Sequence, residues 1–420
     1  MKIELELLLA AIITIVVVSL SFYFVSPNVD DYWHFSLAKW IAKDPSILIT
    51  TVYPVESTRF VEGPNGVLIY PILMHIMLVP FVMLGAEKIF FILMFSIFML
   101  LMWKWEKRAI PFLFLSFALT RISVFGGIDL VLMVMAVGCI YFFDKKPIVS
   151  GVFAGLAPLV KGFGFMILLG YIISIIAYNR KSFRTNKKIF VGIIVALLIT
   201  STWYVRNLMC ENWNIMTALT SADIGKINQI LNTGFQATQP ERNLWDETGY
   251  YPLPIDLLLY VGIAFTAFNI YKKKKILPEH VFILIAISAY FLMHFLNITL
   301  LMVLRYYLFI FPFLAVQIAR SLSEKQLRYA YVVTMIFFVF FIYSLQNYQW
   351  NAFDAQLKTS GVCQTIKNNV GNNTVYIKAF QDLFIIWECG LTYQAVIENE
   401  SVWTVDFYNG TIYKTNTTGV

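Results

Sequence analysis

Long apolar runs, repeated along the 420 residues, constrain this chain more than any other feature. The first covers Leu7 to Val25, and similar runs recur until about residue 346. A bilayer core about 30 Å thick needs about 20 consecutive apolar residues in a helix, so each run predicts a membrane-spanning helix. Hydrophobic residues make up 59% of the chain and charged residues 14%, which is more apolar surface than a soluble domain needs. We therefore expect an all-α polytopic membrane protein.

Basic residues in the connections between these runs predict the orientation. The clusters lie near residues 104–108, 145–146, 180–188, 272–275 and 320–328. Lys and Arg are enriched in cytoplasmic loops, so we place all five clusters inside, with a cytoplasmic N-terminus and about 11 crossings. This topology also explains the net charge of +7 without a nucleic-acid partner.

The predicted crossings follow the apolar runs. They are 5–25, 87–103, 109–126, 128–143, 148–160, 163–178, 189–208, 253–270, 279–297, 299–319 and 328–346. Segment 67–86 is also apolar enough to span, but an extra crossing there would put the 104–108 cluster outside, against the positive-inside rule. We expect this segment to be re-entrant or to lie along the membrane interface.

Two loops and the tail are predicted outside the cytoplasm of an integral plasma-membrane protein. A transmembrane domain, 1–346, would carry external loops 26–66 and 209–252. The tail, 347–420, combines a helical pattern with alternating, strand-like runs, which predicts a small extracytoplasmic α/β or mostly β domain. The helical pattern covers 354–370, and the strand-like runs are 374–380, 384–389, 391–397, 402–408 and 411–415.

The tail contains two features that suit an external location. Cys363 and Cys389 are its only cysteines, and an extracytoplasmic compartment allows a disulfide between them. Four Asn-x-Ser/Thr sequons occur at Asn372, Asn399, Asn409 and Asn416. Chance occurrence in an Asn- and Thr-rich segment is the alternative to glycosylation.

Six charged residues are not explained by topology, because they lie within apolar runs or at their outer ends. Such residues are functional candidates by default. They are Asp30, Asp31, Asp129, Lys161, Arg206 and Arg305. Carboxylates suit a general base, and Lys and Arg suit a phosphate.

Simpler interpretations exist for single members of this set. Asp129 opens a helix and suits the positive end of its dipole. Arg206 ends a helix and can extend to lipid headgroups. Lys161 is harder to explain in this way, because a buried ammonium needs a counter-charge, which an anionic ligand would supply. The four histidines, His34, His75, His280 and His294, show no metal-ligand spacing and suit packed polar groups.

Five motifs in order resemble the GT-C superfamily of membrane glycosyltransferases. The most specific is Gly151-x3-Gly155-Leu-Ala-x3-Lys161-Gly162, which matches a family pattern G-x3-GLA-x2-xKG. The first-loop pattern keeps its offsets in Asp30, Asp31, His34 and Ala38, with His and Asp replacing an aromatic residue and Glu.

The remaining motifs lie further along the chain. Asp129 matches the family's second acidic residue, which also opens a helix. A Trp-Tyr-x-Arg-Asn segment appears at 203–207, with Thr202 where the family usually has Pro, and an RY-x-L-x3-P segment appears at 305–312. The resemblance covers residues 1–320 and favours the protein O-mannosyltransferase and aminoarabinose-lipid-A transferase branch. Residues 244–247 do not match the WWDYG motif of oligosaccharyltransferases, so transfer of a whole glycan is not expected.

The resemblance implies an inverting hexosyl- or pentosyltransferase that uses a polyprenyl-phosphate sugar, such as a dolichyl-phosphate mannose, on the outer membrane face. Asp30 would be the general base, and Asp31 and Asp129 would orient the acceptor or assist the base. Lys161, Arg206 and Arg305 would hold the donor phosphate. Further candidates by position in the motifs are His34, Trp203, Tyr204 and Tyr306.

The cofactor and the partners follow from the same resemblance. A divalent metal is left open, with Asp30 and Asp129 as its candidate ligands. The expected partners are membrane lipid, the lipid-linked donor and a protein, lipid or glycan acceptor. The absence of a Walker loop or Rossmann fingerprint agrees with a donor other than a nucleotide sugar. A transporter or flippase for a polyprenyl-linked or anionic substrate is the alternative, although no inverted repeat is evident.

Overall fold

The structure is a computed structural model. It describes residues 5–23, 34–35, 38–39, 41–42, 45, 73–178, 187–210, 256–295, 304–345, 368, 375–377, 393–394, 402–406 and 411–415.

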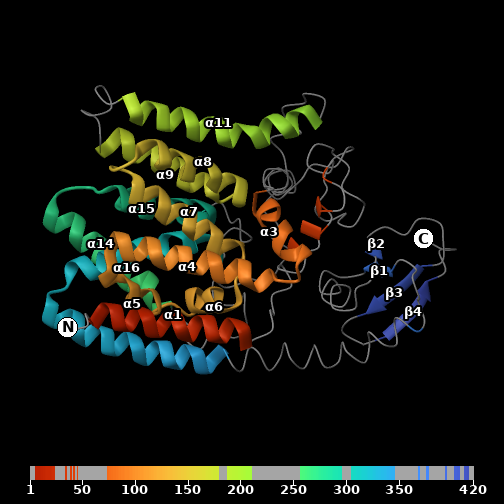
Figure 1. The fold of residues 1–420 in the computed structure, drawn as a ribbon. Helices are drawn as coiled ribbons and strands as arrows, with labels where there is room; N and C mark the ends of the chain where they lie inside the picture. Colours follow the sequence, from red (N-terminus) through yellow and green to blue (C-terminus); the bar gives the residue numbers. More distant parts are fainter. Residues whose placement is uncertain are drawn as a thin grey trace.

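Most described helices stack side by side, with their long axes running between the same two ends (Figure 1). The labelled α-helices are α1 (Leu5–Tyr23), α3 (Leu73–Met83), α4 (Glu87–Glu106), α5 (Ile110–Leu113), α6 (Phe117–Phe125), α7 (Ile128–Phe142), α8 (Pro147–Val160), α9 (Gly164–Tyr178), α11 (Lys187–Cys210), α14 (Leu257–Lys273), α15 (Pro278–Phe295) and α16 (Phe311–Ser321). A further helix, Glu324–Leu345, carries no label and is called here the last membrane helix.

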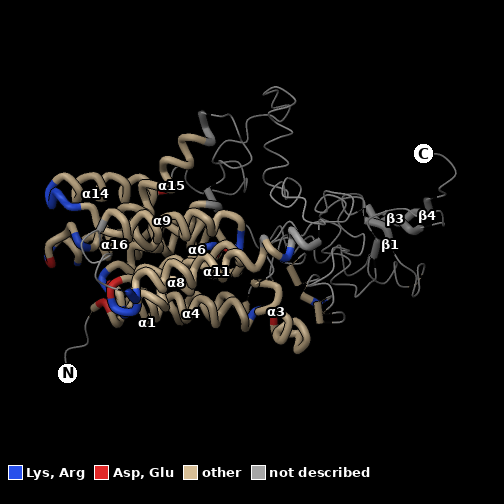
Figure 2. Tube along the Cα trace, turned by 90° about the horizontal axis from the view of Figure 1, so that it is seen from above, with Lys and Arg blue, Asp and Glu red and all other residues tan. Residues whose placement is uncertain are grey.

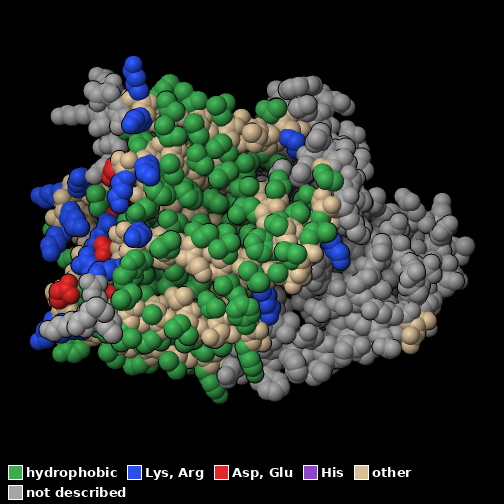
Figure 3. Space-filling view, in the orientation of Figure 1, with side chains coloured by type: hydrophobic (Ala, Val, Ile, Leu, Met, Phe, Trp, Pro, Cys, Tyr) green, Lys and Arg blue, Asp and Glu red, His purple; other side chains and the backbone are tan. Residues whose placement is uncertain are grey.

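The Lys and Arg side chains of the bundle gather mainly at one end, which we call the basic end (Figures 2 and 3). They come from elements that are far apart in the sequence: Lys104, Lys107, Arg108, Lys146, Lys272, Lys273 and Arg320. The opposite end is called the site end. This gathering is what the assignment of all basic clusters to one membrane face predicts. That this face is the cytoplasmic one stays a prediction from the positive-inside rule.

Three described helical segments are long and apolar enough to cross a membrane by length and composition. They are Leu5–Tyr23, Glu87–Leu113 and Glu324–Leu345, and a fourth results if the bent pair α6–α7 counts as one span. Other apolar helices, α8 and α9 among them, are shorter. The expected count of about 11 crossings therefore stays a prediction. The described part of segment 67–86 is α3, whose 11 residues extend only about 16 Å.

Segment 109–126, expected as one crossing, is instead broken into pieces. A 3₁₀ turn, η2 (Lys107–Ala109), precedes α5, and α6 begins only at Phe117 after the capping hydroxyl of Ser116. The helix then turns by 108° into α7. Gly126 and Gly127 make this turn with φ of 91° and 127°, a region that side chains strongly disfavour. A Cβ on Gly126 would also lie 2.4 Å from the Phe91 ring, so the turn requires glycine.

Helix α7 is the centre of the bundle. Every residue from Ile128 to Ile140 is buried, which is the behaviour of a helix that is apolar on all sides. By contrast, α1 and the last membrane helix expose large apolar side chains such as Ile15 and Tyr343. Figure 3 shows hydrophobic side chains spread over this face of the bundle. Such faces suit contact with lipid.

Small residues bring α8 and α11 into close contact. A Cβ added to Gly151 would lie 2.1 Å from the Gly192 carbonyl oxygen, and one on Gly155 would lie 2.6 Å from that of Ala196. The contacts advance together along both helices, so the helices are parallel. This small-x3-small packing allows close backbone approach where no hydrophobic force drives helices together in lipid.

The described part of the tail forms one four-stranded sheet. Its strands are β1 (Val375–Ile377), β2 (Tyr393–Gln394), β3 (Val402–Asp406) and β4 (Thr411–Thr415), in the order β2-β1-β3-β4. β1 pairs in parallel with both β2 and β3, whereas β3 and β4 are antiparallel. All four strands fall within segments that the sequence predicts as strands. In Figures 1 and 2 the sheet lies beyond the site end of the bundle.

Candidate active site

A buried ion pair between Asp129 and Lys161 is the main feature of the site end. The ammonium nitrogen of Lys161 lies 2.5 Å from Oδ1 of Asp129, and both residues are only 6% exposed. Asp129 lies in the first turn of α7, and Lys161 is the residue that ends α8. Two residues that are 32 positions apart therefore meet at neighbouring helix ends.

Each charge of the pair also lies at the helix end that favours it. A helix N-terminus carries partial positive charge and stabilises the Asp129 carboxylate, while the C-terminus of α8 carries partial negative charge and stabilises the Lys161 ammonium. The chain leaves α8 abruptly, because Lys161 has an extended backbone with φ −155° and ψ 147°. Gly164 then opens α9 so close to α8 that a Cβ would lie 2.1 Å from the Ala157 carbonyl oxygen.

The lengths of α7 and α8 predict the depth of the ion pair. α7 has 15 residues and α8 has 14, so each extends only about 21–22 Å from the basic end. If the basic end lies at one face of a bilayer core about 30 Å thick, the pair would lie about 8 Å short of the opposite face. The counter-charge that Lys161 requires is therefore present in the protein itself as Asp129. A ligand phosphate would share this lysine with the aspartate.

The segment that contains Arg305 and Tyr306 lies beside this pair. It forms a 3₁₀ helix, η4 (Leu304–Ile310), which packs against α7. The buried ring of Tyr307 meets Phe163, two residues after Lys161, edge to face at 5.6 Å. The side chains of Arg305 and Tyr306 themselves lie outside the described residues. The described part of η4 nevertheless brings the 305–312 motif next to the motif that ends at Gly162, which lies about 140 residues earlier in the sequence.

The Trp-Tyr-x-Arg segment belongs to α11 and lies slightly further toward the site end. Trp203 is buried, and the Arg206 guanidinium lies over its ring at 5.5 Å from the centroid. Stacking of this kind holds the guanidinium in a fixed plane. The Gly155–Ala196 contact gives a common reference point on the two parallel helices. Lys161 lies about 9 Å further along α8, and Arg206 lies about 15 Å further along α11. Arg206 is therefore about one helical turn closer to the site end than Lys161. The side chain of Tyr204 lies outside the described residues.

The structure reveals a partner for His34 that the sequence analysis did not assign. Nδ1 of His34 and Nε2 of His75 lie 2.8 Å apart in a hydrogen bond, with both residues almost completely buried. His75 belongs to α3, so the bond joins the first-loop motif to this short helix. The available signal was a single polar residue, His75, within an apolar run. The sequence analysis expected both histidines to be packed polar groups but did not predict that they bond to each other.

Several predicted positions lie outside the described residues. They are Asp30, Asp31, Cys363, Cys389, the asparagines of the four sequons and residues 211–252 of the predicted loop 209–252. Within the described ranges, no three His, Cys, Asp or Glu side chains come together as a metal site would require. The assignment of Asp30 and Asp129 as metal ligands remains a prediction.

Comparison with solved structures identifies the architecture. ArnT from Cupriavidus metallidurans in the apo state matches with a TM-score of 0.54 at 12% sequence identity, over 96% of this chain and 87% of ArnT. The apo oligosaccharyltransferase of Archaeoglobus fulgidus matches with a TM-score of 0.53 at 13% identity, over 94% of this chain and 65% of that enzyme. The chain has a GT-C-like fold. No protein-family model matches the sequence, and neither does any curated protein sequence.

At 12% and 13% identity, this likeness shows a shared fold. In the match to the archaeal oligosaccharyltransferase bound to zinc and sulfate, this chain covers 62% of that protein's length, which is slightly less than two thirds. The likeness includes both ArnT and an oligosaccharyltransferase, so it does not favour the single branch expected from the motifs. Mannose as the transferred sugar has no support from these matches.

Proposed function

We propose that this protein transfers a sugar from a polyprenyl-phosphate donor to an acceptor hydroxyl at the site end of the bundle. The observation that carries the proposal is the buried Asp129–Lys161 pair, which lies at the end of the helices where the predicted motifs meet. The GT-C-like fold supports it, because the similar structures include an oligosaccharyltransferase. The resemblance of the first-loop motif supplies the remaining member of the machinery, Asp30.

The proposed reaction is a single inverting displacement. Asp30 accepts the proton of the acceptor hydroxyl as its oxygen attacks the anomeric carbon. The bond between that carbon and the phosphate oxygen breaks, and the polyprenyl phosphate leaves with the electron pair. Asp31 orients the acceptor. The products are a glycosylated acceptor, the lipid phosphate and a proton on Asp30 that is later released to water.

Lys161 acts on the leaving phosphate. Charge builds up on the phosphate oxygens as the bond breaks, and an ammonium that is already fixed in place stabilises it without reorganisation. Asp129 holds the ammonium at the end of α8 and, from the start of α7, maintains its orientation before the donor arrives. Arg206, with its stacked guanidinium, and Arg305 complete the cationic surroundings of the phosphate.

The function is tested by transfer of radiolabelled sugar from a polyprenyl-phosphate donor in membranes with and without the protein. We expect transfer only with the protein. Asp30→Asn should reduce it by about 10²–10⁴-fold while membrane insertion is unchanged, because it removes a positioned base. Asp31→Asn, the neighbouring carboxylate, should be milder and serves as the matched control. Donor movement across the membrane without sugar transfer would identify a flippase instead.

A double variant separates a catalytic from a structural role of the ion pair. Asp129→Asn combined with Lys161→Met removes both charges, so no unpaired charge remains buried and the fold should be retained. We expect thermal unfolding close to the wild type but transfer reduced by at least about 100-fold, in the range for lost charge stabilisation. Full activity in this variant would mean that the pair is only structural.

A further inference from the structure

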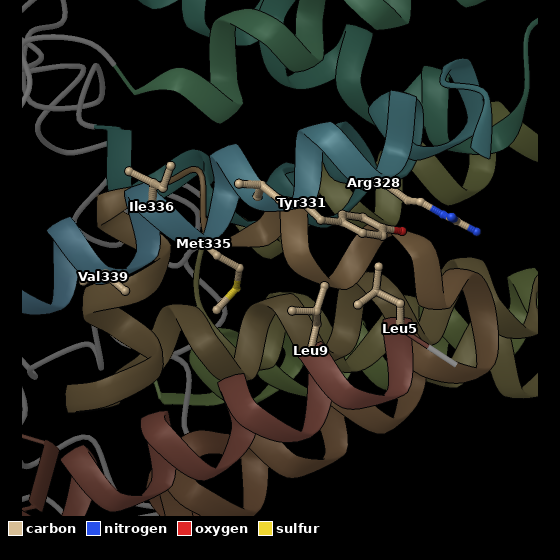
Figure 4. Close-up of a pocket in the computed structure, with 8 residues that line it drawn as sticks. Leu5, Leu9, Arg328, Tyr331, Met335, Ile336 and Val339 are labelled. Carbon is tan, nitrogen blue, oxygen red and sulfur yellow. The ribbon is translucent and has the colours of Figure 1, made fainter. Parts of the chain in front are cut away.

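A groove lies between α1 and the last membrane helix in the half of the bundle near the basic end. It has a volume of about 470 Å³ and is lined almost entirely by apolar atoms of Leu5, Leu9, Arg328, Tyr331, Val332, Met335, Ile336 and Val339. Figure 4 shows Leu5 and Leu9 pointing from α1 toward Tyr331 and Met335 across the groove. From Arg328 to Val339 it extends about 16 Å, half the thickness of a bilayer core.

The last membrane helix is firmly fixed on its other side. Phe338 and Phe341 pack edge to face on Phe114 and Phe117, and Tyr331 packs on Phe112. The Tyr331 hydroxyl donates a hydrogen bond of 3.2 Å to the Arg108 carbonyl oxygen. Tyr331, which forms one wall of the groove, is therefore held in place. Helix α1 does not close over the groove.

Arg328 lies at the mouth of the groove, and its side chain extends toward the basic end (Figure 4). Within the described part of the chain, no carboxylate lies within 4.0 Å of its guanidinium. Glu6 and Glu324 are close enough to act on the Tyr331 phenol, yet neither pairs with Arg328. The mouth thus presents a cation with free donors above an apolar channel.

We propose that this groove binds one anionic phospholipid of the leaflet at the basic end. The apolar walls would cover an acyl chain, and Arg328 would bind the phosphate with charge-assisted hydrogen bonds. Basic pockets between membrane helices on the cytoplasmic side are a known type of lipid headgroup site.

The first experiment measures the contribution of the charge. Phosphatidylglycerol and phosphatidylcholine are titrated separately into the delipidated, detergent-solubilised full chain, and the one-to-one complex is quantified by native mass spectrometry. We expect phosphatidylglycerol to bind more tightly. Arg328→Gln should weaken it by about fivefold, the factor expected for one basic side chain at an anionic leaflet.

The matched control for charge is Lys325→Gln. Lys325 is an exposed cation one turn earlier on the same helix and does not line the groove. It should change the dissociation constant by less than about twofold. Equal effects of both substitutions, or equal binding of the two lipids by the wild type, would overturn the proposal in favour of general surface charge.

The second experiment measures the contribution of the groove itself. Val332→Trp should fill it and abolish the complex with either lipid, whereas Val333→Trp, at the neighbouring exposed position outside the groove, should not. Unchanged binding by Val332→Trp would place the lipid elsewhere and overturn the proposal. Efficient cross-linking of Ile336→Cys to a second copy in membranes would do the same, because the occupant would then be another protein chain.

Discussion

The two ends of the bundle manage buried charge in opposite ways. At the basic end, Arg320 contacts both Glu106 and Glu279, and Glu106 also accepts a hydrogen bond from Arg108. Several of these side chains are partly exposed to the surroundings. At the site end, Asp129 and Lys161 form one pair that is almost completely buried.

This difference is one of redundancy. Glu106 and Arg320 each have two partners, so either one keeps a partner when the other contact is lost. Exposed groups can also be solvated, so loss of a peripheral member such as Arg108 should have little effect. The Asp129–Lys161 pair is almost completely buried, so removal of one member leaves the other without that partner in a low-dielectric interior. A buried charge of this kind is a functional candidate, and under the proposed function its task is the stabilisation of the donor phosphate.

Among single substitutions at the two ends, we expect Asp129→Asn to have the largest effect on stability. It leaves the Lys161 ammonium buried without its counter-charge, and we expect a loss of about 3–5 kcal/mol in the free energy of unfolding. Denaturant titration in mixed micelles measures this. The double variant with Lys161→Met should recover most of the loss. A single variant as stable as the wild type would show that the pair is well solvated rather than buried.

A smaller effect is expected from the packing that aligns α8 with α11. Gly151→Ala places a methyl group 2.1 Å from a backbone carbonyl that cannot move aside, and we expect a loss of about 1–3 kcal/mol with reduced activity. Gly170→Ala is the matched control, because its methyl group would meet the ring of Phe282 at 3.1 Å. Thermal unfolding in detergent compares the two. Equal melting temperatures would contradict the close α8–α11 contact.

At the basic end, Arg108→Gln should change the free energy of unfolding by less than about 1 kcal/mol. Glu106 keeps Arg320 as a partner, and the Tyr331 hydroxyl still bonds to the backbone carbonyl of residue 108. The same mixed-micelle titration, repeated at low and high salt, should show that the small effect is screened. A loss as large as that of Asp129→Asn would remove the distinction between the two ends.

The smallest perturbation tests which end faces outward. Leu84 at the site end and Tyr271 at the basic end are similarly exposed, at 80% and 82%. In a background without other cysteines, Leu84→Cys should react with a membrane-impermeant thiol reagent on intact cells, and Tyr271→Cys only after permeabilisation. The reverse pattern would invert the predicted topology and move the proposed reaction to the cytoplasmic face.

Much of the bundle follows from the sequence, because long apolar runs predict helices directly. Predicted segments 128–143, 148–160 and 163–178 correspond to α7, α8 and α9 within one residue at each boundary. The break between α5 and α6 was not predicted, because Ser116, which caps α6, lies within an otherwise apolar run. The turn at Gly126 and Gly127, by contrast, falls at the predicted boundary between segments 109–126 and 128–143. Apolarity alone does not distinguish a straight helix from a broken one.

The site was only partly predictable for a similar reason. Asp129 and Lys161 could each be named from the cost of placing a charge in an apolar run. Their pairing could not, since it requires the start of α7 and the end of α8 to meet in space. The same holds for His34 and His75, whose bond depends on how α3 folds against the first loop.

The shortness of α8 and α9 has a consequence for how the chain is assembled. Each is too short to cross a bilayer alone, and the lysine at their junction opposes insertion of either one. We therefore expect the two helices to enter the membrane together as a hairpin. Because α7 is synthesised before them, its aspartate is already in place when the hairpin arrives and can neutralise the lysine on entry. Order of synthesis and order of burial thus coincide, and the chain never has to hold Lys161 in lipid without a partner.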